Sequence, residues 1–175
     1  EFAVAMFEKR FTNKDAFAVS PAGQWTPQQS INYRVNQALH GTGWWAREGL
    51  EGPLPQSWRW SGPGCESQIL FHLDATKNYK LSVRVVNSIV PELLNTLRIS
   101  INGALLEMTR QSDGQWGVLY EGLVPQHLFR QDAPNTTLQL AVAETKKFST
   151  VDPSSKDDRV CGIAVVQLHP EVVTV

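Results

Sequence analysis

Alternation of apolar and polar residues is the strongest pattern along this chain. In YKLSVRVVN, residues 79–87, an apolar residue stands at every second position from Tyr79 to Val85, with polar residues between. Successive side chains of a β-strand point to opposite faces, so the segment is predicted to be a strand with one buried face. TLRISIN at 96–102 and TTLQLAVAE at 136–144 repeat the pattern. The central part of the chain is therefore predicted to be a β-sheet structure.

Turn signals separate the apolar segments. The pair Asn102–Gly103, between TLRISI and ALLEM, is typical of a type I′ hairpin turn. About eight short strands with frequent turns and almost no helix predict an all-β antiparallel sandwich of two sheets. Its first and last strands are expected to lie side by side, as they do in jelly rolls. The expected strands cover residues 31–35, 66–73, 79–87, 96–102, 104–108, 114–122, 136–144 and 162–172.

The N-terminal part reads differently. Apolar residues recur at roughly helical spacing in AVAMFEKRF, residues 3–11, which predicts a short helix. The following stretch, residues 15–30, is rich in Pro, Gln and Ser and is expected to be extended. We therefore divide the chain into a lead-in, residues 1–30, and a sandwich domain, residues 31–175. The lead-in comes from a preceding domain or packs as a strap on the outside of the sandwich.

Composition narrows the class of partner. With 42% hydrophobic residues the chain can bury a real core. The net charge of −1 lacks the basic surplus of a nucleic-acid-binding protein. No apolar run approaches the ~20 residues that a membrane-spanning helix needs. We expect neither a nucleic acid partner nor a transmembrane segment.

The two cysteines, Cys65 and Cys161, have no CxxC partner, which excludes the common zinc and redox motifs. Free buried thiols are the favoured interpretation, and a disulfide between them is the alternative. Free thiols are compatible with a cytoplasmic location, which is our expectation, and an extracellular location stays open.

The usual signatures of catalysis are absent from the sequence. It has no G-x-S-x-G motif, no histidine pair at metal-binding spacing and no glycine-rich phosphate loop. We expect no enzymatic activity and no cofactor. Asp152, Asp157 and Asp158 cluster before the last strand and could bind a structural Ca²⁺, or form a solvated or arginine-paired loop. Arg159 is predicted to make a structural ion pair that fixes this loop.

Four of the six tryptophans lie in GWWAREGLEGPLPQSWRWSGPG, residues 43–64. One interpretation is structural: Trp58 and Trp60 share a face of a strand, and at least one of them is expected to be buried. Arg59 points the other way and could pair with an acidic residue such as Asp158.

The other interpretation of this stretch is a binding platform. If Trp44 and Trp45 are extended, they alternate, so one of the two is expected at or near the surface. An indole ring can stack on the apolar face of a sugar while neighbouring polar groups bind the hydroxyls. It can equally contact a neighbouring domain. The candidate carbohydrate-binding residues are Trp44, Trp45, Arg47, Arg59 and Trp116.

A resemblance rests on four segments taken together: GWWAREGLEGPLPQSWRWSGP, LRISINGALLE, NTTLQLAVAE and DDRVCGIAVVQL. Their order resembles galactose-binding-like jelly rolls, the carbohydrate-binding-module-like accessory domains of bacterial glycosyltransferases and other glycan-assembly proteins. The similarity covers roughly residues 40 to 170. It implies a carbohydrate-binding-like fold without establishing a ligand.

These observations favour a non-catalytic carbohydrate-binding accessory module of a larger protein that synthesises or modifies glycans. Its partners would be an oligosaccharide or polysaccharide and the other domains of its parent. A protein-interaction module docking against those domains is the second hypothesis, and a small hydrolase is the third.

Overall fold

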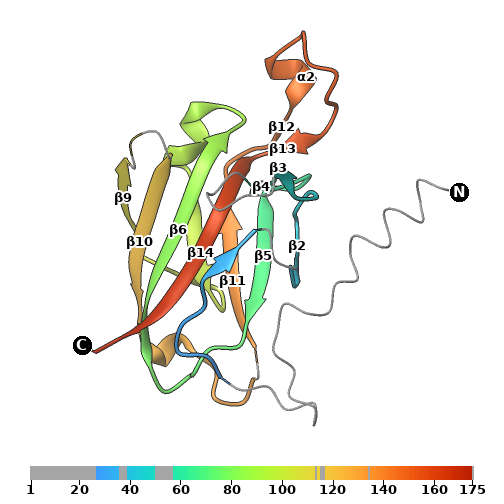
Figure 1. Ribbon diagram of the computed structural model, residues 1–175. Helices are drawn as coiled ribbons and strands as arrows, with labels where there is room; N and C mark the ends of the chain where they lie inside the picture. The colour runs from blue at the N-terminus through green and yellow to red at the C-terminus, as the bar shows by residue number, and fades with distance from the viewer. Residues whose placement is uncertain are drawn as a thin grey trace, which may run out of the picture.

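Strands account for nearly all the regular structure in the computed structural model (Figure 1). The structure describes residues 27–35, 39–49, 57–112, 114, 117–133 and 135–174, so the helix predicted at 3–11 lies outside the described residues. The strands are β1 Tyr33–Arg34, β2 Gly41–Thr42, β3 Glu48–Gly49, β4 Ser57–Trp60, β5 Glu66–Phe71, β6 Asn78–Ser88, β7 Arg98–Ile101, β8 Ala104–Leu105, β9 Thr109–Ser112, β10 Val118–Val124, β11 Thr136–Ala141, β12 Lys146–Lys147, β13 Val160–Cys161 and β14 Ile163–Val173. The helical pieces are the 3-10 turns η2 Pro91–Asn95 and η4 Gln126–Leu128 and the single turn α2 Phe148–Val151.

Two antiparallel sheets form the body. The seven-stranded sheet has the order β3-β4-β14-β6-β10-β9, with β1 also paired to β14. The five-stranded sheet has the order β2-β5-β11-β7-β8. Figure 1 shows the two sheets stacked face to face, with β14 and β6 running the length of one of them. The fold is the all-β antiparallel sandwich that the alternation predicts.

The core consists of the inward positions of the alternating strands. Every second residue of β6 from Tyr79 to Val85 is buried, as predicted. Ile99 and Ile101 of β7 and Leu138 of β11 face them from the other sheet and are also buried. The layers interdigitate because each strand has one apolar face.

The first and last strands lie side by side, which confirms the expectation. Tyr33 of β1 is paired with Leu168 of β14. The pairing begins before the expected domain start, because Ser30 forms a bridge to Glu171 and the hydroxyl of Tyr79 donates to the carbonyl of Gln28 at 2.7 Å.

The hairpin at Asn102–Gly103 is confirmed. Both residues have positive φ, 49° and 86°, as a type I′ turn requires, and they connect paired Ile101 and Ala104. The Asn102 side chain adds two bonds outside the turn. Its amide donates to the carbonyl of Leu128 at 3.0 Å, and its oxygen accepts from the backbone N–H of Thr137 at 2.9 Å.

The segment expected as a loop at 145–159 contains a small arm. β12 and β13 pair as a separate two-stranded sheet, and α2 lies between them along the chain. Figure 1 shows this arm projecting beyond one end of the sandwich. Alternation does not reveal it, because each strand has two residues and the contacts that hold it come from distant parts of the chain. None of the described helices is long or apolar enough to span a membrane.

Candidate functional site

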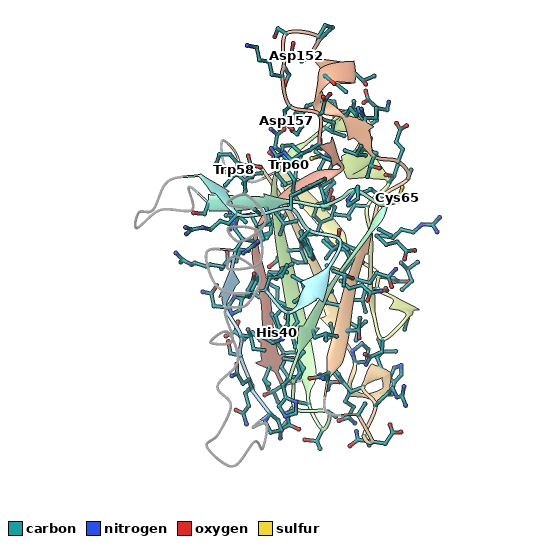
Figure 2. The ribbon with its side chains drawn as sticks, turned by 90° about the vertical axis from the view of Figure 1, so that its right-hand side faces the viewer. His40, Trp58, Trp60, Cys65, Asp152 and Asp157 are labelled. Carbon is teal, nitrogen blue, oxygen red and sulfur yellow. The ribbon has the colours of Figure 1, made fainter. Side chains whose placement is uncertain are left out.

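The described residues of the tryptophan-rich stretch (43–64), which are 43–49 and 57–64, lie where the arm joins the sandwich. Figure 2 shows Trp58 and Trp60 at that end, with Asp157 close by and Asp152 towards the tip of the arm. Trp60 is 4% exposed and meets the ring of Phe148 edge-on, with centroids 4.9 Å apart. Trp58, two residues earlier on β4, is half-buried. The prediction that at least one of the pair is buried is confirmed.

Trp44 is in the core rather than at the surface. It is 8% exposed, and its indole N–H donates to the carbonyl of Gln68 at 3.0 Å. Its backbone forms a bridge to Ser61, the residue that directly follows β4. With 8% of its surface exposed, Trp44 offers little ring surface on which a sugar could stack.

Trp45 is half-buried beneath the arm. Its indole N–H donates to the carbonyl of Val160 at 2.9 Å, and the Arg159 guanidinium lies 6.0 Å from the ring centroid. Gly62 makes this approach possible. A Cβ there would lie 2.2 Å from the carbonyl oxygen of Val160 and 2.7 Å from the Trp45 indole nitrogen. The ring serves to seat the arm.

Arg159 makes the structural ion pairs that the sequence predicts. Its guanidinium donates to both carboxylate oxygens of Asp157 and, across the base of the arm, to Glu48 of β3. The hydrogen bond from Arg159 holds the pKa of Asp157 below its usual range. The Arg159 guanidinium also lies 5.9 Å from the centroid of the Phe148 ring. One side chain thus links β13, α2 and β3.

The three aspartates of this loop are engaged separately. Asp152 accepts from the Ser154 hydroxyl at 2.6 Å, and Asp158 accepts from the Ser149 hydroxyl at 2.8 Å. No group of three potential metal ligands gathers anywhere among the described residues. The arrangement matches the arginine-paired alternative for this loop.

Two of the remaining candidate residues lie near the same end. Arg59 donates to the carbonyls of Val35 at 3.2 Å and Trp45 at 3.3 Å, so the suggested pairing with Asp158 is wrong. Arg47 is half-buried. Trp116 lies outside the described residues. The structure therefore does not assemble Trp44, Trp45, Arg47 and Arg59 into an exposed platform.

A cleft of about 360 Å³ lies on the other side of the sandwich. It opens between β8 and β9, the last strands of the two sheets, and η2 borders it. Of the ten described residues that line it, seven are apolar or aromatic, and the three polar ones are Asn95, Arg98 and Arg110. Its size and composition fall within the range of small-ligand sites, ~300–1,000 Å³ with a few polar groups on an apolar wall.

Hydrogen bonds fix the walls of the cleft. The hydroxyl of Tyr120, on β10, donates to the carbonyl of Leu94 in η2 at 2.7 Å. Arg110, on β9, donates to the side-chain oxygen of Asn95. Burial raises the pKa of Tyr120, and the positive charge of Arg110 opposes that shift, so the guanidinium lies close to the buried phenol. These bonds hold η2 over the cleft and orient one arginine at its rim.

Sequence reasoning did not find this cleft. Arg98 and Arg110 stand on either side of the Asn102–Gly103 hairpin, and only the folded sheets bring them to one opening. No local pattern in this part of the sequence signals the cleft: alternation across Leu105 and Leu106 places only one of the two at the surface, and in the structure Leu105 is 65% exposed.

Both cysteines are free. Cys161 is buried, and burial raises the pKa of its thiol to about 12. Cys65 is exposed, so the expectation that both thiols are buried is wrong for this residue. No disulfide joins them.

No protein-family model matches the chain. No curated protein matches it either. Among solved structures, the chain is similar to a family 35 carbohydrate binding module from Clostridium thermocellum, with 14% identity and a TM-score of 0.49 over 82% of this chain and 98% of that one. It is also similar to the GH26-CBM35 β-(1,4)-mannanase of Podospora anserina, with 14% identity and a TM-score of 0.48, over 84% of this chain and 28% of that one. Similarities this distant transfer neither a ligand nor a role, and the conclusions below rest on this chain's own residues.

Proposed function

We propose that the chain is a non-catalytic carbohydrate-binding module and that it holds its saccharide in the cleft between β8 and β9. We also propose that the chain is an accessory module of a larger protein that synthesises or modifies glycans, such as a glycosyltransferase. The tryptophan-rich stretch has a different task in this proposal, because its buried rings anchor the arm.

The observation that supports the proposal is the make-up of the cleft wall. A pyranose has an apolar face of C–H groups and a rim of hydroxyls. The apolar C–H face can lie against Leu105, Met108 and Tyr120. The hydroxyls can form directed hydrogen bonds with the planar side chains of Asn95, Arg98 and Arg110. The walls are already hydrogen-bonded in place, so binding a rigid ring orders few further groups.

Leu105 gives the sharpest test, because it lines the cleft and is 65% exposed. Leu105→Ala should leave the melting temperature nearly unchanged and weaken binding to the oligosaccharides that a glycan array selects, measured by calorimetry. The matched control is Leu123→Ala, since Leu123 is an exposed leucine (46%) on β10 that does not line the cleft. It should change neither property.

Two results would contradict the proposal. If no glycan binds the unmodified chain, the protein-docking alternative replaces it. If glycans bind but Leu105→Ala and Leu123→Ala behave alike, the saccharide sits elsewhere on the sandwich.

A further inference from the structure

Among the described residues, the two arginines of the cleft have no counter-charge. Arg98 and Arg110 both line it, and neither forms an ion pair with any carboxylate of the described residues. None of the described residues that line the cleft is acidic. Glu92 and Glu107 lie on the bordering segments but are not part of its wall. Elsewhere in the described chain, Arg130 and Arg159 are paired with aspartates.

A hydrogen bond fixes the orientation of one of these arginines. Arg110 donates to the neutral side-chain oxygen of Asn95, which orients the guanidinium without neutralising it. A guanidinium has five donors in a planar fork, so the remaining N–H groups stay available to a second acceptor. That geometry suits a planar or tetrahedral oxyanion, which accepts two parallel bonds from one arginine.

The positive charge of the cleft is local. The chain as a whole carries a net charge of −1, so its overall field does not attract anions. Arg98 and Arg110, which form no ion pair among the described residues, therefore bring two positive charges to one apolar opening. A neutral sugar would leave both of these charges unused.

We infer that the saccharide bound in this cleft carries an acidic group, a carboxylate or a sulfate ester, which Arg98 and Arg110 bind while the sugar ring lies against Leu105 and Met108. This inference rests on the proposed function and specifies the ligand class of the same site. The two acidic groups share the chemistry of an oxyanion, and the experiment separates them.

The test compares matched probes on the full chain by calorimetry. The probes are short oligogalacturonates, the same chains after reduction of their carboxyl groups, sulfated galactan oligosaccharides, and a polyglutamate peptide. We expect an acidic saccharide to bind at least about 10-fold more tightly than the carboxyl-reduced chains, because a hydrogen bond to a charged group is lost with the acid. The preference should weaken as salt is raised. Whichever acidic probe binds identifies the oxyanion.

The variants are Arg98→Gln and Arg110→Gln, with Arg130→Gln as control. Both cleft arginines are exposed, so these changes should leave the melting temperature nearly unchanged. Each cleft variant should lose about 10-fold or more in affinity for the acidic saccharide and little for the neutral one. Arg130 is an exposed arginine outside the cleft, so Arg130→Gln should not change the affinity for either saccharide.

The outcomes distinguish failure of the acidic ligand class from failure of carbohydrate binding. Equal binding of acidic and reduced chains, with no effect of the arginine variants, overturns the acidic ligand and leaves carbohydrate binding intact. Binding of polyglutamate as tight as that of the acidic saccharide overturns the saccharide class. Failure of every glycan to bind overturns both proposals.

Discussion

Trp60→Ala tests the structural role of the tryptophan-rich stretch most directly. The side chain is 4% exposed and packs edge-on against Phe148 at 4.9 Å. Truncation of a buried tryptophan costs ~3–5 kcal/mol, because the apolar contacts are lost and the cavity does not fully collapse. In a domain of this size ~1 kcal/mol lowers the melting temperature by ~2–4 °C. Trp60→Ala should therefore melt roughly 6–20 °C below the unmodified chain.

The control for this variant is Trp58→Ala on the same strand. Trp58 is half-buried, so its truncation removes less packing and should cost less than half as much. Denaturant unfolding followed by circular dichroism gives the free energies for both variants. Limited trypsin digestion gives a second readout, because loss of the Phe148 contact should make the arm easier to cleave near Lys146 and Lys147.

The reasoning fails if Trp58→Ala and Trp60→Ala destabilise equally, because the structure gives the two rings different burial. It also fails if Trp60→Ala melts like the unmodified chain while glycan binding is lost. That pattern would make the ring a ligand contact rather than the anchor of the arm.

Arg159→Ala should lower the melting temperature by a few degrees and leave glycan affinity unchanged, and the reverse pattern would place Arg159 in the binding site. Gly62→Ala should destabilise the fold far more than Gly103→Ala. A Cβ at position 103 has open space, so that change costs only ~1–2 kcal/mol for the positive φ. Equal melting temperatures of the two variants would refute the close packing at Gly62. In the native protein a thiol reagent such as DTNB should modify Cys65 quickly and Cys161 only on unfolding, and two fast thiols would contradict the burial of Cys161.

The sequence predicted the parts of the fold that local chemistry determines. β6 alternates from Tyr79 to Val85 because one face must be buried, and a pattern of period two reports that without knowledge of the partner strand. The turn at Asn102–Gly103 is equally local, because it needs two residues that tolerate positive φ. Such features depend on neighbouring residues alone.

Features held by distant contacts were not predictable in this way. The argument for an exposed ring assumed that Trp44 and Trp45 alternate between core and solvent. In the structure Trp44 is buried and Trp45 is half-buried, because the carbonyls of Gln68 and Val160 accept hydrogen bonds from their indole N–H groups and the arm covers part of the second ring. A tryptophan can be buried wherever a distant strand provides an acceptor, and nothing in residues 43–64 reveals that strand.

The cleft and the anchored arm lie at opposite edges of the sandwich. β3 and β2 stand first in the two sheet orders, near the tryptophan-rich stretch, and β9 and β8 stand last. Substitutions at sites this far apart, with no shared partners, act independently to a good approximation. Stability and binding should therefore separate cleanly in this chain. We propose that the tryptophans of residues 43–64 serve folding and that the cleft lined by Arg98 and Arg110 is the binding surface.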